Sequence, residues 1–301
     1  MESREVLKTL LYSDIFDFPL KEEEIYYYLI SPKKVSKKKV LLEIENERKK
    51  KTVDEFKGMY FIRGKRKSAE QRLRNERIVE KKIDLARQIA GRIGIIPTIS
   101  FIGISGGLSM RNARPADDID FFVITKSKTL WVTRILMVLG LLIMGVYRKR
   151  NDRNVRNKIC LNMLIDERSM GFKERSRNIY IAHEISQIIP LFERNKTYKK
   201  FLSKNLWIGK FLANFKEKEV QISKNKGNKI LVSLIGNLEG FSQFLQIIYM
   251  RNHVTNETLD KGYAAFHPFD YGAYILSEYR KRATRYGVLD KKSPNYYTRG
   301  Y

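Results

Sequence analysis

The chain has 301 residues, of which 43% are hydrophobic and 12% aromatic, with 7 Pro and 18 Gly. This composition predicts a globular protein with a sizeable core and excludes collagen-like, linker-like and disordered classes. The 59 Lys and Arg outnumber the 33 Asp and Glu and give a net charge of +26. Such a surplus indicates either a polyanionic partner or a general lysine bias that needs no ligand.

The single cysteine, Cys160, excludes an internal disulfide, and the three histidines are dispersed rather than clustered at zinc-ligand spacing. Residues 1–12 alternate charged residues with single apolar ones, unlike the apolar core of a signal peptide. We therefore expect a cytoplasmic protein.

Residues 1–67 predict a separate small domain with three helices and a β-hairpin, the order of elements in a winged helix. Ser36 can cap the third helix, and Lys57-Gly58 can form the hairpin turn. The expected elements are helices over residues 4–12 and 21–30, a third helix after Ser36, and strands over residues 53–56 and 59–62.

The second half of this domain is strongly basic, with 14 Lys or Arg against 5 acidic residues between positions 31 and 67. A recognition helix and a wing with this charge predict binding to nucleic acid. The same surface is compatible with protein contacts or with a solvated charged face, because fold does not determine function.

Residues 68–94 predict a long linking helix, because apolar residues recur every three or four positions from Val79 to Ile93, just before Gly94. Residues 173–301 have helical periodicity and predict an α-helical C-terminal domain. Its expected helices cover residues 178–189, 198–215, 229–250 and 270–285.

An apolar segment over residues 129–147 is followed directly by three basic residues. Its uncharged part, from Ile135 to Tyr147, is 13 residues long, whereas a membrane-spanning helix needs about 20. The length favours a buried helix, and no stable membrane association is expected.

Residues 95–172 predict a small mixed sheet in which a glycine turn and two carboxylates follow one another. Because side chains alternate along a strand, Asp118 and Asp120 point to the same face. A divalent cation, Mg²⁺ or Mn²⁺, would offset the repulsion between them. The expected strands are residues 98–104, 118–124 and 158–165, with the turn Ser105-Gly106-Gly107 between the first two.

Gly106-Gly107, ten further residues and then Asp118-Ile119-Asp120 resemble the signature of the DNA polymerase β-like nucleotidyltransferase superfamily. Residues 112–120, NARPADDID, are similar to the D-A-R-P-D-S-D-I-D stretch of minimal nucleotidyltransferase domains. The resemblance covers roughly residues 98–166. It implies an α+β protein with a nucleotidyltransferase palm over residues 95–172, between the winged helix and the helical domain.

By this resemblance, Gly106 and Gly107 cradle the triphosphate of an NTP, and Asp118 and Asp120 are the catalytic carboxylates that bind two metal ions. The family pattern also implies a third carboxylate on the next strand. The sequence has Asn162 there, which can ligate a metal through its carbonyl oxygen but cannot act as a base.

Three further residues are predicted to contact the nucleotide. Gly107 replaces the serine that the family often has at this position, so Ser105 or Ser109 can supply the hydroxyl contact to phosphate. Arg111, close to the turn, can neutralise the triphosphate or serve only to solvate the spacer.

These residues predict a metal-dependent nucleotidyltransferase that moves an NMP from an NTP to an acceptor hydroxyl. The acceptor could be a nucleic acid 3′ end, a protein or a small molecule. Because Asn162 stands where a third carboxylate is implied, the alternative is a winged-helix nucleic-acid-binding protein whose palm binds nucleotide without turning it over.

Overall fold

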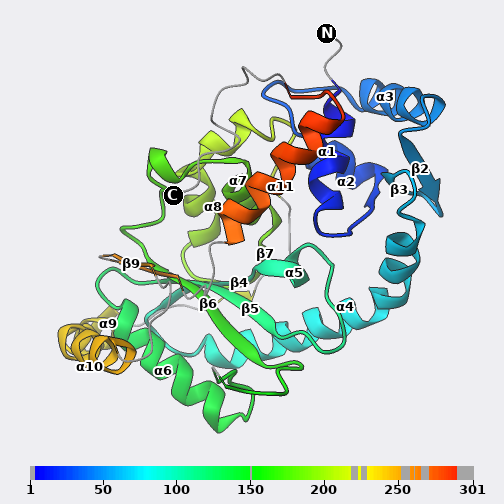
Figure 1. Ribbon diagram of the computed structural model, residues 1–301. Coiled ribbons are helices and arrows are strands. Elements are labelled where there is room, and N and C mark those ends of the chain that lie inside the picture. The colour runs from blue at the N-terminus through cyan, green and yellow to red at the C-terminus, as the bar shows by residue number, and fades with distance from the viewer. Residues whose placement is uncertain are drawn as a thin grey trace.

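The computed structural model describes residues 4–149, 151–217, 223–224, 229–251, 258–260, 262–265 and 271–289. These residues form a mixed α+β structure, which confirms the expected class (Figure 1). A small antiparallel sheet lies near the N-terminus, and a larger mixed sheet occupies the middle of the molecule.

The N-terminal module, residues 4–62, has the helices and the hairpin that its sequence predicts. Ser36 caps the third helix, because its Oγ accepts a hydrogen bond from the Lys39 backbone N–H at 3.3 Å. Lys57 and Gly58 turn the hairpin, both with positive φ. Its elements are α1 (Glu5–Asp14), β1 (Leu20–Lys21), α2 (Glu22–Tyr27), α3 (Lys37–Lys49), β2 (Val53–Phe56) and β3 (Met59–Ile62), and the sheet order is β1-β3-β2.

Helix α4 (Arg66–Ile93) confirms the predicted linking helix and ends at Gly94. Its apolar stripe, which includes Val79, Ile83 and Ala90, is buried against the large sheet. The long helix therefore connects the N-terminal module to the face of the sheet that it covers (Figure 1).

The large sheet has the order β8-β7-β4-β5-β6-β10-β9 among the described residues. Strand β4 is antiparallel to β5 and β7, whereas β6 is parallel to β5. The strands are β4 (Ile99–Ile104), β5 (Ile119–Thr125), β6 (Ile159–Asp166), β7 (Ile189–Glu193), β8 (Ser223–Lys224), β9 (Thr258–Asp260) and β10 (Tyr263–Ala265).

Alternate side chains of β5 divide the core in two. Ile119 and Phe121 pack with α4 and α6 (Leu130–Ile143) on one face of the sheet. Phe122 and Ile124 pack on the other face, in a core shared with the N-terminal module and with α7 (Ile179–Gln187), α8 (Thr197–Ser203) and α11 (Tyr271–Arg285). By this alternation Asp120 lies on the second face, where α5 (Gly106–Ser109) and α7 are found (Figure 1).

The prediction that residues 173–301 form an α-helical domain is wrong for four segments, because β7, β8, β9 and β10 join the large sheet. Four of the five residues of β7 are buried, and such a short apolar run has no alternation that separates a strand from a helix. The predicted single helix over residues 198–215 is α8 followed by a 3₁₀ turn (Leu206–Lys210). A further 3₁₀ turn covers Glu174–Ser176. The remaining helices are α9 (Lys229–Gly236) and α10 (Glu239–Arg251).

Helix α6 is only half buried, which corrects the prediction of a buried helix. Leu130 and Met137 are in the core, but Leu139, Leu142 and Ile143 are exposed by 51%, 42% and 87%. No single helix among the described residues has both the length and the apolar character to cross a membrane. The bent pair α9 and α10, with an angle of 43° between its halves, meets the two criteria only when taken together.

A buried arginine fastens β7 to the connection between α4 and β4. Arg194 is 2% exposed, and its guanidinium donates hydrogen bonds to the carbonyl oxygens of Gly94 (2.6 Å), Ile96 (3.0 Å) and Ile99. The Ile96 carbonyl oxygen also accepts a hydrogen bond from the Ile99 backbone N–H at 3.2 Å, so the guanidinium is a second donor to this group.

Candidate functional site

The glycine turn and the two aspartates meet at one edge of the large sheet. Ser105 follows β4 directly, Asp118 immediately precedes β5, and Asp120 is the second residue of that strand. The Ser105 backbone N–H donates a hydrogen bond to the Asp120 carbonyl oxygen at 2.9 Å. The antiparallel pairing of β4 and β5 therefore brings together residues that the sequence separates by more than ten positions.

Gly106 fits closely against Asp120. Its φ of +64° lies in the left-handed region, which glycine adopts at little cost. A Cβ atom at this position would overlap the Oδ2 atom of Asp120, whereas one on Gly107 would meet only the Asn112 carbonyl oxygen at 3.4 Å. The lack of a side chain at Gly106 therefore lets the backbone lie directly beside the Asp120 carboxylate. Position 107 has no such steric restriction.

The loop before β5 is held in place by a buried lysine. Lys82 of α4 is 3% exposed, and its Nζ donates hydrogen bonds to the Asp117 carbonyl oxygen at 2.6 Å and to Asn157 Oδ1 at 2.8 Å. The Arg114 backbone N–H donates a hydrogen bond to the Asp117 carboxylate at 2.7 Å. These contacts fix the chain directly before Asp118.

Asp118, Asp120 and Cys160 form a compact cluster, in which one potential ligand atom of each lies within 4.8 Å of the others. The parallel register places Cys160 of β6 beside Asp120. Asn162 coincides with an irregularity in this pairing, since Phe121 pairs with the residue before it and Phe122 with the residue after it. The Asn162 Nδ2 donates a hydrogen bond to Ser105 Oγ at 3.2 Å. The β6 residue next to Asp120 is therefore Cys160, which carries a thiol, and not Asn162.

The electrostatics of the cluster favour a cation. Burial and then the negative charge of Asp118 raise the pKa of Asp120 to about 7, against the opposing effect of Arg148. Arg148 Nη1 lies 2.5 Å from Asp118 Oδ2. Burial and the two carboxylates raise the pKa of the Cys160 thiol to about 12, so it is neutral at physiological pH. The two hard carboxylate groups suit Mg²⁺ or Mn²⁺.

A third carboxyl group lies within the electrostatic field of Asp120. Burial and then the charge of Asp120 raise the pKa of Glu184, on α7, to about 7. Sequence reasoning missed Glu184, Cys160 and Arg148 as site residues. No local signal marks them, since the first lies in an amphipathic helix, the second depends on strand register, and the third follows an apolar segment.

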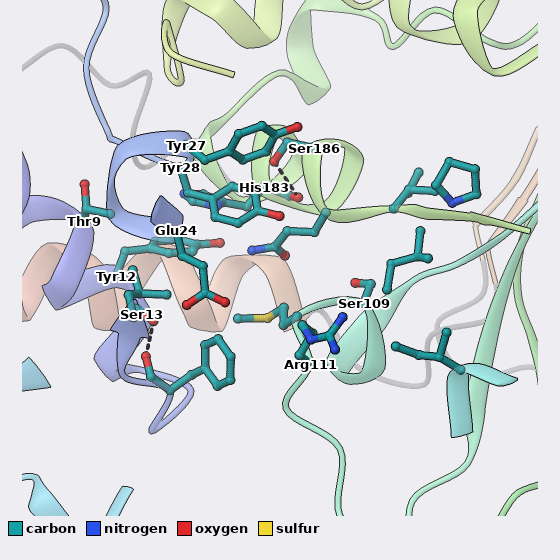
Figure 2. Close-up of a pocket in the computed structure, with 18 of the residues that line it drawn as sticks. Thr9, Tyr12, Ser13, Glu24, Tyr27, Tyr28, Ser109, Arg111, His183 and Ser186 are labelled. Atoms are coloured by element: carbon teal, nitrogen blue, oxygen red, sulfur yellow. Dashed lines mark hydrogen bonds between the residues drawn. The ribbon is translucent and has the colours of Figure 1, made fainter. Parts of the chain in front are cut away.

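The structure places Ser109 and Arg111 on a cavity at the far end of α5 (Figure 2). The Ser109 hydroxyl donates a hydrogen bond to the Gly106 carbonyl oxygen at 2.7 Å. Arg111 forms an ion pair with Glu80 of α4. These two predicted nucleotide contacts therefore already have protein partners.

The cavity has a volume of about 290 Å³ and lies between the N-terminal module and the helices α4, α5 and α7. Tyr12, Tyr28 and His183 gather along one side of it (Figure 2). The His183 ring stacks on Tyr12 with 4.1 Å between the ring centres, and burial lowers its pKa to about 3, so it is neutral. None of Asp118, Asp120 and Cys160 is among the described residues that line this cavity.

Comparison of the chain with protein-family models, curated proteins and solved structures found no match in any of the three. A function must therefore be inferred from the chemistry of the acidic cluster and its surroundings.

Proposed function

We propose that the protein is a nucleotidyltransferase that transfers an NMP from an NTP to an acceptor hydroxyl, with release of pyrophosphate. The observation that carries this proposal is the close fit of Gly106 against Asp120 beside a second carboxylate, Asp118. At this place a phosphate can approach the backbone N–H groups of the turn, and the carboxylate oxygens can bind a metal ion beside it. This arrangement agrees with the motif resemblance in the sequence.

In this reaction Asp118 and Asp120 hold divalent metal ions, which supply electrostatic stabilisation at the reacting phosphorus. The backbone at Ser105, Gly106 and Gly107 orients the triphosphate. Arg148 neutralises Asp118 in the structure described here, and metal binding would free its guanidinium to pair with a phosphate oxygen.

Neither Cys160 nor Asn162, the two β6 residues discussed above, can act as a general base. The Cys160 thiol is protonated at physiological pH, because burial and the neighbouring carboxylates raise its pKa, and an amide such as Asn162 takes up no proton. Phosphoryl transfer depends mainly on positioning and electrostatic stabilisation. In the proposed reaction, catalysis therefore depends on the two carboxylates and on the orientation of the triphosphate.

We assign the N-terminal module to the winged-helix class and the large sheet to a nucleotidyltransferase palm. The support for the first assignment is the order of three helices and a hairpin, with basic residues exposed along α3 and the segments around it. These exposed charges favour a nucleic acid end as the acceptor, with α3 and the hairpin along its backbone.

A second candidate function is a nucleic-acid-binding protein whose palm binds nucleotide without catalysis. The observation that favours it is the lack of an acidic residue beside Asp120 on β6, where Cys160 and Asn162 stand. Such a protein would bind NTP and nucleic acid but release both unchanged.

The two functions separate in a label-transfer experiment. The full chain is incubated with each labelled NTP, Mg²⁺ or Mn²⁺, and pooled RNA, DNA and protein acceptors. We expect transfer that disappears when Asp118→Ala and Asp120→Ala are combined and persists in Asp84→Ala, an exposed acid on α4. Absence of transfer with NTP binding retained would support the second function, and absence of both would contradict the two proposals.

The two glycines of the turn provide a matched pair of variants. Gly106→Ala is expected to slow transfer at least about tenfold, because Ala is strained at positive φ and its Cβ displaces the Asp120 carboxylate. Gly107→Ala, with ordinary space around its Cβ, is expected to stay within about twofold of the wild type. Steady-state rates with saturating metal provide the comparison, and equal effects of the two variants would refute this role of Gly106.

A further inference from the structure

Exposed apolar side chains are concentrated on three neighbouring helices. Of the 18 large hydrophobic residues that are exposed among the described residues, 12 belong to α6, α9, α10 and the turn between the last two. We call this set the apolar face. Its members are Leu139, Leu142, Ile143, Ile230, Leu231, Leu234, Leu238, Phe241, Phe244, Leu245, Ile247 and Ile248.

The polar groups of α10 are directed toward α6. The Glu239 carboxylate accepts hydrogen bonds from the Trp131 and Val132 backbone N–H groups at 3.0 Å, and Gln246 Nε2 donates to the Trp131 carbonyl oxygen at 2.9 Å. Arg134 Nη1 donates to Gln246 Oε1 at 2.6 Å. The apolar side chains of α10 are left exposed to solvent. Helices α6, α9 and α10 lie at the end of the molecule opposite the N-terminal module (Figure 1).

A face of this kind is unfavourable in water. Between Ile230 and Met250 the only charged residue is Glu239, whose carboxylate caps α6. Contiguous exposed apolar surfaces are uncommon on proteins that work alone and mark sites of association with a protein or a membrane. The apolar face therefore needs an occupant.

The charges around the face identify the chemistry of that occupant. Residues 121–151, which include α6, contain no acidic residue, and Lys128 and Lys149 are exposed directly before α6 and a few residues after it. The whole chain carries +26, so electrostatic repulsion opposes a second copy. A surface that is both apolar and anionic fits best.

We propose that the apolar face docks on the surface of a membrane that contains anionic lipids, which departs from the expectation of no stable membrane association drawn from the length of residues 129–147. Amphipathic helices with basic flanks bind in this way, with the apolar side buried at the boundary between headgroups and acyl chains. No member of the apolar face belongs to the cluster of Asp118, Asp120 and Cys160, and the proposal does not depend on nucleotidyl transfer.

In this proposal, helices α9 and α10 lie along the membrane surface and do not cross the bilayer. The pair is bent by 43°, and its halves have 8 and 13 residues, whereas a straight span needs about 20. Helix α10 is hydrogen-bonded to α6, and the inner side of α6 belongs to the core of the large sheet. Full insertion would break both contacts, but shallow docking preserves them.

Vesicle flotation of the full chain tests this proposal. We expect it to float with vesicles of phosphatidylcholine mixed with phosphatidylserine, less with phosphatidylcholine alone, and less as salt increases. Combined Phe241→Ser and Phe244→Ser should weaken binding at least about tenfold, since two exposed aromatic side chains lose their contact with lipid. Leu206→Ser, at an 80% exposed position outside the face, is the matched control and should bind as the wild type does.

Three results would overturn the proposal: no flotation with either vesicle, equal flotation of the double serine variant, or a dimer that the double variant converts to a monomer without any vesicle binding. Analytical ultracentrifugation detects the last case. Far-UV circular dichroism confirms that the variants fold, which is expected because the replaced side chains are exposed. Nucleotide binding, measured on the same preparations, reports separately on the acidic cluster.

Discussion

Asp120→Asn is expected to reduce nucleotidyl transfer at least about a hundredfold, the scale on which a single electrostatic group acts at a reacting centre. The substitution keeps the size of the side chain and removes one of two carboxylates from the cluster with Asp118. Single-turnover rates with saturating Mg²⁺ measure the loss. A structural role for Asp120 would leave the rate close to that of the folded wild type.

The same substitution is expected to stabilise the metal-free protein at pH 8. Burial and Asp118 raise the folded-state pKa of Asp120 to about 7 from a reference of 3.8, so the folded state binds more protons between these values. The free energy of unfolding therefore falls as pH rises through this window. Asparagine carries no charge, and a gain of about 1–3 kcal/mol is expected at pH 8.

Urea unfolding in the presence of a chelator, at pH 5 and at pH 8, tests this second half of the prediction. The difference between Asp120→Asn and wild type should grow toward pH 8. Reduced activity combined with increased stability is typical of a residue kept for function. Loss of stability at both pH values would instead indicate that the Asp120 carboxylate holds the fold together.

Arg194→Met is expected to lower the free energy of unfolding by about 3–5 kcal/mol, the cost of disrupting a buried charged network. Methionine fills much of the space of the arginine stem beside Phe192, whose ring centre lies 4.9 Å from the guanidinium carbon. It cannot donate hydrogen bonds to the carbonyl oxygens of Gly94, Ile96 and Ile99. Three carbonyl oxygens would each lose a hydrogen bond at once, although Ile96 keeps its bond from the Ile99 backbone N–H.

Thermal and urea unfolding measure this effect, with Arg87→Met as the control. Arg87 pairs with Asp84 on the surface of α4 and is 48% exposed, so its replacement should change stability by less than about 0.5 kcal/mol. Comparable losses in the two variants would show that the buried hydrogen bonds of Arg194 contribute little.

Features encoded by neighbouring residues could be predicted from the sequence. Ser36 and Lys57-Gly58 specify a helix start and a hairpin turn locally, and both are confirmed. The groups that interact in these two features are close in the chain. The approach of Gly106 to Asp120 spans more than ten positions, and it depends on the antiparallel pairing of the consecutive strands β4 and β5.

Features that depend on distant segments could not be predicted. Cys160 stands beside Asp120 because of the register between β5 and β6, two parallel strands joined by a long crossover. The outer side of α6 is exposed next to α10, which lies about a hundred residues further along. Strand β7 resembles any short buried apolar run until its partner β4 is known.

The core shared by the N-terminal module and the rest of the chain has a mechanical consequence. Side chains of α1 and α11 pack in that core, and Arg282 of α11 forms an ion pair with Asp14 of α1. The N-terminal module is therefore packed against the rest of the chain and is not connected to it by a flexible linker alone. Under the proposed function, the distance from α3 to Gly106 and Asp120 is therefore set by core packing and not by the length of a flexible linker.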